Sequence, residues 1–169
     1  MAPGDDGLPA PALRVRDALR ASGIETAIVV FDASTRSAAD AAATIGCTVA
    51  QIAKSLVFRT DPGDRPVLVV ASGINRVEEA KVAAALADQT DGARIARADA
   101  AFVRQATGYA IGGVPPVGHA TPPLVAIDQD LLAFTEIWAA AGTPNAVMRL
   151  SPDQLVQATA GCVAAIAAA

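Results

Sequence analysis

Short apolar segments that end at turn residues alternate with helix-like segments along the chain. The apolar segments are rich in Val, Ile, Leu and Phe, which suit the pleated, half-buried surface of a sheet. They are predicted as strands over residues 24–31, 54–59, 66–71, 124–128, 136–141 and 146–150. Turn residues lie between two consecutive pairs of these strands, 60–65 in the first case and 142–145 in the second. Both pairs are therefore predicted as β-hairpins.

Helices are predicted where a capping residue opens a segment and a glycine closes it. The predicted helices are a short one ended by Gly23, 37–45 closed by Gly46, a very short one opened by the capping box 48–51, 75–87 with Asn75 as N-cap, 99–107 with Asp99 as N-cap and Gly108 as stop, and one opened by Ser151-Pro152-Asp153-Gln154. Hairpins with helices between them predict a single compact domain of the mixed α/β class. Its sheet is predicted to be mixed or largely antiparallel, not doubly wound and parallel. Residues 1–11 are rich in Pro, Gly and Asp and are predicted as a flexible leader, which leaves 12–169 for the domain.

Composition and charge narrow the function classes. The 169 residues are 53% apolar and 18% charged, with 13 Lys and Arg against 17 Asp and Glu and a formal net charge of -4. Because the only lysines are Lys54 and Lys81, a polybasic coat for duplex DNA is not expected. The longest apolar run, 162–169, is much shorter than the roughly 20 residues of a membrane helix, and acids stand where a signal peptide carries positive charge. The sequence therefore predicts a cytoplasmic protein without a membrane partner.

Several catalytic and cofactor motifs are absent from the sequence. One histidine, His119, and two distant cysteines, Cys47 and Cys162, do not suit a zinc cluster, a C-x-x-C redox pair or a disulfide scaffold. There is no nucleophile elbow, no phosphate-binding P-loop and no dinucleotide fingerprint. No metal and no cofactor are expected, and an enzyme of this sequence is expected to work without the standard covalent hydrolase apparatus.

Lys54 is the most informative single residue. It stands between the apolar segments 52–53 and 56–58, in a chain that otherwise uses Arg for positive charge. One interpretation is a lysine that extends its ammonium to solvent from the end of an edge strand. The other is a partly desolvated cation that binds a phosphate or carbonyl oxygen.

The segment 108–119, GYAIGGVPPVGH, is predicted as a shaped loop because glycines and adjacent prolines break both helices and strands. Glycines let backbone N–H groups approach a ligand, and the prolines reduce the entropy lost on binding. A rigid structural turn is the alternative. Tyr109 is a candidate for stacking on a base or sugar, with a core or rim position as its alternative.

Two of these segments together point to a known family. The segment 48–58, TVAQIAKSLVF, and the loop 108–119 closely resemble the YbaK/EbsC family, stand-alone relatives of the editing domain inserted in bacterial prolyl-tRNA synthetases. The later segments 137–145 and 150–152 are also similar to single-domain members of that family. The resemblance spans roughly Leu13 to Gly161.

The resemblance implies a compact mixed α/β fold with helices around a barrel-like sheet, and a trans-editing deacylase that hydrolyses the ester of a mischarged tRNA. It implies that Lys54 is the catalytic residue, which orients the aminoacyl end or its phosphate. The substrate-binding residues that it implies are Gly112, Gly113, Val114, Pro115 and Pro116. Ser55, Tyr109 and His119, which lie in the same two segments, are predicted as further substrate-binding residues. Because an aminoacyl ester is already activated, positioning and substrate-assisted water attack suffice without a protein nucleophile.

The implied partner is the aminoacylated 3′ end of a tRNA. Whether a synthetase or an elongation factor delivers it, and the oligomeric state, stay open. Pro115 stands where some relatives carry Ser, so alanine, cysteine, serine and threonine, on tRNA-Pro or a related tRNA, all stay open as the amino acid removed. The alternatives in other classes are a non-catalytic module of the same fold that binds a tRNA end, a nucleotide or a protein, and a small-molecule hydrolase or amino-acid binder.

Overall fold

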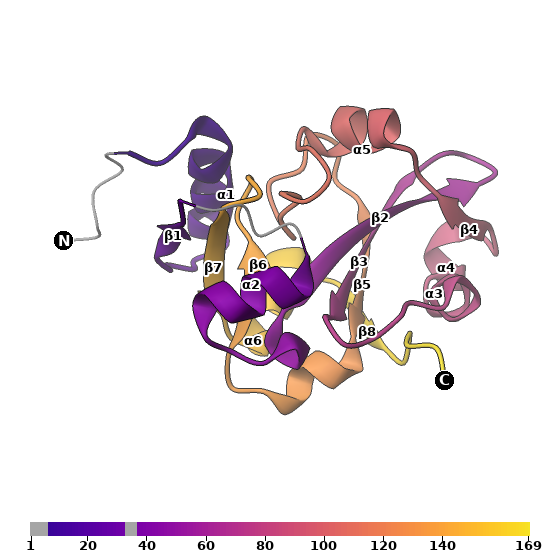
Figure 1. The fold of residues 1–169 in the computed structure, drawn as a ribbon. Helices are drawn as coiled ribbons and strands as arrows, with labels where there is room; N and C mark the ends of the chain where they lie inside the picture. Colours follow the sequence, from indigo (N-terminus) through magenta and orange to yellow (C-terminus); the bar gives the residue numbers. More distant parts are fainter. Residues whose placement is uncertain (1–6, 33–36) are drawn as a thin grey trace.

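The computed structural model describes residues 7–32 and 37–169 (Figure 1). Its α-helices are α1 (Ala10–Ala21), α2 (Ala38–Ile45), α3 (Glu79–Ala85), α4 (Ala87–Thr90), α5 (Ala100–Thr107) and α6 (Pro152–Thr159), and its 3₁₀-helices are η1 (Val49–Gln51) and η2 (Gln129–Ala133). Its strands are β1 (Ile28–Val30), β2 (Ala53–Asp61), β3 (Pro66–Ser72), β4 (Arg94–Arg97), β5 (Leu124–Asp128), β6 (Ile137–Ala140), β7 (Ala146–Leu150) and β8 (Cys162–Ala164). The predicted mixed α/β class is confirmed. The leader predicted over 1–11 falls partly on residues 1–6, which lie outside the described residues.

The strands form two sheets. The larger sheet has the order β4-β2-β3-β5-β8 and the smaller one the order β1-β7-β6. β2 pairs antiparallel with β3 and β4, whereas β5 pairs parallel with β3 and β8. The predicted mixed sheet is confirmed. Both strand orders are open in the described part of the chain, so the barrel-like sheet takes the form of two adjoining sheets and not of a closed barrel.

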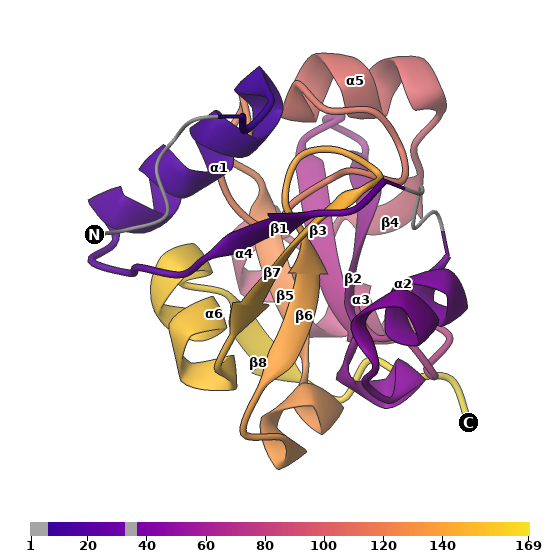
Figure 2. The ribbon, with the colours of Figure 1, turned by 60° about the vertical axis from the view of Figure 1, so that its left-hand side comes forward.

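The two sheets meet beside the start of β2. Ile52, the residue before β2, forms an isolated parallel bridge with Trp138 of β6. Figure 2 shows the smaller sheet in front of the larger one, with α1 and α6 on one side of it and α2 on the other. Segments far apart in sequence are therefore brought to the first residues of β2.

β3 lies at the centre of the core. Its residues from Val67 to Ala71 have no solvent exposure, because side chains pack on both faces of the sheet there. Leu68 and Val70 belong to the cluster between the two sheets, whereas Val67, Val69 and Ala71 pack with residues of α3, β5 and the C-terminal segment. A strand buried on both faces is expected to be a continuous apolar run, which is what this segment shows.

Most of the predicted helix ends are confirmed. Ser37 caps α2 with its side chain, and Gly46 ends that helix in the left-handed conformation. Asp99 caps α5, and capping boxes form at Thr48 and at Ser151. These ends depend on contacts within one turn of chain, which explains why local sequence predicts them.

Three predictions of secondary structure differ from the structure. The strand predicted over 24–31 is reduced to β1, since only three of its residues pair with β7. The short strands β4 and β8 were not predicted; they are defined by pairing with β2 and β5. The helix predicted from Asn75 begins at Glu79 instead, and Glu78 occupies its N-cap position. Asn75 is held in the turn before it.

Over residues 7–32 and 37–169 no helix combines the length and apolar character that a bilayer crossing needs. The same residues contain no group of three His, Cys, Asp or Glu side chains arranged to hold a metal ion.

Candidate functional site

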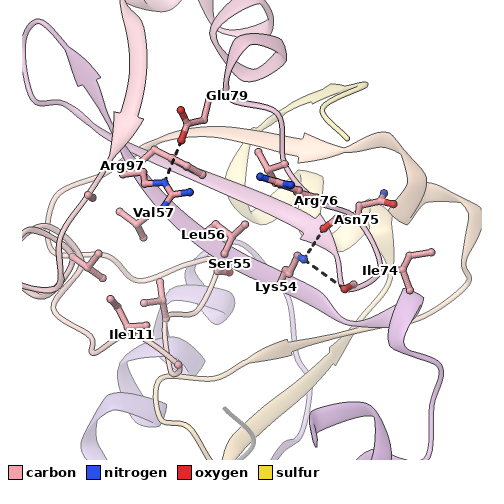
Figure 3. Close-up of a pocket in the computed structure, with 17 residues that line it drawn as sticks. Lys54, Ser55, Leu56, Val57, Ile74, Asn75, Arg76, Glu79, Arg97 and Ile111 are labelled. Carbon is pink, nitrogen blue, oxygen red and sulfur yellow. Dashed lines mark hydrogen bonds and ion pairs between the residues drawn. The ribbon is translucent and has the colours of Figure 1, made fainter. Parts of the chain in front are cut away.

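Lys54 is held by the turn that follows its partner strand. The β2–β3 register places Lys54 opposite Ala71, so its side chain reaches the turn after Ser72. The ammonium donates to the carbonyl of Asn75 at 2.6 Å and lies 3.5 Å from the carbonyl of Gly73 (Figure 3). An ammonium has three N–H donors, so this arrangement leaves a donor for a ligand.

A buried carboxylate holds the same turn from the other side. Asp128, the last residue of β5, is 1% exposed and accepts hydrogen bonds from the Ser72 N–H at 3.0 Å and from the Asn75 side-chain amide at 2.8 Å. It also accepts from the Asp130 N–H at 3.0 Å, and the Asn75 amide donates to Asp130 at 2.7 Å. Asn75 is thus a bridge between Lys54 and Asp128 and not the predicted helix cap.

Burial and charge act in opposite directions on Lys54. Partial burial lowers the pKa of its ammonium below the ordinary 10.5, because removal from water disfavours the charged form. The negative charge of Asp128 raises the pKa of Lys54 again, to a smaller extent. The result is a cation that is poorly hydrated, oriented by two carbonyls and poised to interact with a ligand oxygen.

Two cavities meet at Lys54. The larger, of about 610 Å³, lies beside the turn 73–77 and also contacts Glu79 and Arg97. The smaller, of about 230 Å³, lies between α2 and β6. Both are lined by Lys54, Ser55, Leu56, Ile111, Gly112 and Val114. The first residues of β2 and the tip of the loop 108–119 therefore separate a larger space, which charged side chains also line, from a smaller and more apolar one.

The loop is fixed to the hairpin of the smaller sheet. A Cβ on Gly113 would lie 2.8 Å from both the Cα and the carbonyl carbon of Thr143, so only glycine allows this contact. Gly112 has a φ of +97°, a left-handed conformation that favours glycine. Val114, which follows them, is 5% exposed and lines both cavities. The two glycines thus allow the loop to pack against the hairpin, which places Val114 at both cavities.

The model of the family described as "Aminoacyl-tRNA editing domain" matches residues 32–158, which include all the residues around Lys54 named above. The chain belongs to this family. It is accordingly a hydrolase that deacylates aminoacyl-tRNA, and aminoacyl-tRNA is its partner.

Three relatives support this membership. The chain is 36% identical to the uncharacterized protein YwhH of Bacillus subtilis (strain 168) over 131 residues, 78% of this chain and 80% of the relative. The chain is 41% identical to a protein of known crystal structure, with a TM-score of 0.85 over 96% of this chain and 100% of that one. That protein is provisionally described as a trans-editing enzyme for prolyl-tRNA synthetase. The hypothetical protein APE2540 is 28% identical, with a TM-score of 0.81 over 92% of this chain and 99% of that one.

Not all the predicted site residues of the editing domain lie at the cavities. Lys54, Ser55, Gly112 and Val114 line both, whereas Gly113 and Pro115 line neither. The Ser55 hydroxyl is buried without a hydrogen-bond partner among the described residues. It therefore has no base beside it that would activate it as a nucleophile.

Tyr109 lies in the core, behind the loop. It is 2% exposed, its hydroxyl donates to the carbonyl of Gly118 at 3.0 Å, and the Arg14 guanidinium lies 4.9 Å from its ring centre. Tyr109 thus occupies a core position, as the alternative interpretation has it, and neither face of its ring is free to stack on a base.

His119 also lies behind the loop. Its Nε2 is 2.6 Å from the carbonyl of Pro115, and because a carbonyl only accepts, Nε2 carries the proton. Burial lowers the pKa of the imidazole below 6.5, while this hydrogen bond raises it to a smaller extent. His119 and Pro116 line a separate cavity of about 240 Å³ on the far side of the loop, so here His119 holds the loop and does not reach Lys54.

Sequence reasoning missed several residues that lie around Lys54 in the structure. Asn75 was predicted as a helix cap, Asp128 was not among the predicted site residues, and Arg97 lies on a strand that was not predicted. The smaller cavity is lined by alanines of α2 and by Trp138, none of which was a predicted site residue. The aspartate that follows an apolar strand was a usable signal for Asp128, but nothing local marked the others.

Proposed function

We propose that this editing domain acts in trans, as a free protein that clears a small amino acid from a mischarged tRNA-Pro or a related tRNA. The relative assigned to prolyl-tRNA synthetase trans-editing, whose whole length is covered by the match, supports the tRNA identity. The observation that carries the proposal is the position of Lys54 at the junction of two cavities of different size and polarity.

The two cavities suit the two sides of an aminoacyl ester. The larger one has room for a nucleoside and carries cationic side chains, which suit the terminal adenosine and its phosphate. The smaller one suits an amino-acid side chain. The ester then lies beside Lys54 and Gly112, which both cavities share.

The lining of the smaller cavity favours a small, uncharged side chain. Apart from Lys54 at its edge, the described residues that line it are uncharged, and alanines from α2, β2 and β6 make up much of its wall. Alanine, cysteine, serine and threonine all meet these conditions. Pro115 lines neither cavity, so we expect the lack of a hydroxyl at this position to leave the choice of amino acid unchanged.

Hydrolysis proceeds by direct attack of water on the ester carbonyl. A bond forms between the water oxygen and the carbonyl carbon, and the bond from that carbon to the ribose oxygen breaks. The free hydroxyl of the terminal ribose orients the water, and the proton that the attacking water loses passes to the leaving ribose oxygen, which yields the amino acid and the tRNA. Lys54 stabilises the negative charge that develops on the carbonyl oxygen. Removal of such a group lowers the rate about 100-fold or more.

The decisive experiment is incubation of the purified protein with tRNA-Pro charged with alanine, cysteine, serine, threonine or proline. We expect one or more of the first four to be deacylated, and the proline ester to be spared. Lys54→Ala should lose about 100-fold or more of the rate while keeping its melting temperature close to that of the wild type. Lys81→Ala, a change at the chain's other lysine, is the matched control and should keep full activity.

Absence of hydrolysis for every charged tRNA would refute the proposed activity. A Lys54→Ala protein that remains folded and fully active would refute the role of the lysine.

A further inference from the structure

The two most exposed large apolar side chains of the described residues border the same cavity. Ile74 is 67% exposed and Ile111 is 63% exposed, more than any other large apolar residue in residues 7–32 and 37–169. Ile74 belongs to the turn after β3 and Ile111 to the loop after α5, and both line the larger cavity. Figure 3 shows them on either side of Lys54. Single exposed apolar residues are common, but two from distant segments at one cavity mark a binding surface.

The backbone holds both isoleucines in place. Ile74 lies between Gly73 and Asn75, whose carbonyls accept from Lys54, and the Asn75 side chain is bound to two aspartates. Ile111 precedes Gly112, whose left-handed φ is part of the loop fixed against Thr143. A ligand that contacts both side chains therefore meets a preformed surface, and little conformational entropy is lost on binding.

Two arginines lie at the same cavity. Arg76 is exposed two residues after Ile74, and Arg97 of β4 is exposed at 90% of its side chain with Glu79 at 3.9 Å. A guanidinium binds a phosphate through a planar pair of N–H donors. An apolar surface on which a flat ring can pack, beside cations for a phosphate, is a combination that suits the end of a single-stranded nucleic acid.

We propose that Ile74 and Ile111 contact the faces of the terminal base of the tRNA, and that Arg76 and Arg97 contact the phosphates on its 5′ side. This inference rests on the proposed function, because it assumes that the larger cavity receives the 3′ end. The inference adds a surface that binds the unpaired 3′ end of the tRNA through shape, apolar contact and charge. The four side chains position the substrate and take no part in the chemical step.

The test is a titration with a non-hydrolysable analogue, alanyl-adenosine 5′-monophosphate with an amide in place of the ester. We expect Ile74→Ser and Ile111→Ser each to raise the Kd about 3- to 10-fold. Leu132→Ser is the matched control, since Leu132 is 46% exposed and lines neither cavity, and it should leave the Kd unchanged. All three positions are exposed, so the variants should fold normally.

The arginines are tested with the same analogue with and without its phosphate. Arg76→Gln and Arg97→Gln should raise the Kd for the monophosphate several-fold and leave binding of the unphosphorylated form unchanged. With charged tRNA, all four variants should raise KM and keep kcat within about twofold, because the contacts are equal in the ground state and the transition state.

The outcomes separate this inference from the proposed function. If the wild type hydrolyses mischarged tRNA while the isoleucine variants bind the analogue normally, the inference is wrong and the deacylase proposal stands. If the wild type hydrolyses no charged tRNA, the proposed function fails, and the titration still decides whether a nucleotide binds at the isoleucines. Normal nucleotide binding together with altered self-association of the serine variants would assign the isoleucines to a protein contact and overturn the inference.

Discussion

At the residue scale, the proposed mechanism depends on the charge of Lys54, and the environment of this side chain predicts how activity changes with pH. Burial lowers the pKa of this ammonium, so it loses its proton at a lower pH than an ordinary lysine with a pKa of 10.5. Deacylation should therefore fall as the pH rises, at a pH below 10.5. Initial rates measured at increasing pH, corrected for uncatalysed ester hydrolysis, provide the check. Whatever activity Lys54→Arg retains should lack this decline, because a guanidinium stays charged; a decline that persists in that variant would contradict the assignment.

Asp128 holds the turn whose carbonyl groups accept hydrogen bonds from Lys54. Asp128→Asn keeps one acceptor oxygen but turns the other into a donor, which then faces either the Asp130 N–H or the N–H groups of both Ser72 and Asn75. We expect a loss of about 1–3 kcal/mol in the free energy of unfolding, as for a buried group left unsatisfied. Loss of the negative charge should also lower the pKa of Lys54 further and shift the alkaline decline of activity to lower pH.

Asp130→Asn is the matched control for this change. Asp130 is exposed and also accepts from Asn75, so its variant should be less destabilised. If folded Asp128→Asn shows the same dependence of activity on pH as the wild type, Asp128 does not act on the charge of Lys54 and its role is structural.

At the scale of elements, α2 shapes the smaller cavity. Ala38 and Ala41 lie three residues apart on one face of this helix and both line the cavity, which their small side chains leave open. Ala41→Leu should fill part of the space and lower kcat/KM for threonine-charged tRNA about 10-fold or more, with a smaller effect for alanine-charged tRNA. Ala39→Leu, on the exposed face of α2, is the control and should change neither. Equal losses for both amino acids in Ala41→Leu would refute the assignment of this cavity to the amino-acid side chain.

The elements also differ in how well sequence predicted them. The β2–β3 hairpin and the caps of α2, α5 and α6 follow from turn residues and from side-chain to backbone hydrogen bonds within a few residues. β4 and β8 are short and become strands only by pairing with β2 and β5, so no local pattern announces them. Arg97 reaches the larger cavity through one of these unpredicted pairings.

At the scale of the whole molecule, the net charge of -4 and the cations around Lys54 together predict a modest salt dependence. Each phosphate neutralised on a single strand contributes a slope of about -0.7 to the logarithm of affinity against the logarithm of salt concentration. Contacts from two arginines then give a slope near -1.4 for 1/KM with charged tRNA. Arg97→Gln should make the slope shallower by about 0.7, whereas Arg149→Gln, at an exposed position on β7 away from both cavities, should leave it unchanged. A slope several times steeper would indicate contacts along the body of the tRNA.

The sequence by itself determined the limits of most helices, both hairpins and the irregular loop 108–119, and it singled out Lys54 as a candidate site residue. These features depend on neighbours in the chain or on an unusual residue in an apolar segment. The resemblance in the segments 48–58 and 108–119 also led to the family that the comparison confirmed.

Only the tertiary structure decided which side of each segment faces the two cavities at Lys54. It placed Tyr109 and His119 behind the loop, turned Asn75 from a helix cap into a bridge to Asp128, and brought Arg97 to the cavity. The physical reason is that a side chain's direction depends on the packing of elements distant in sequence. Residue spacing identifies a loop, but it does not determine which of the loop's two faces is buried.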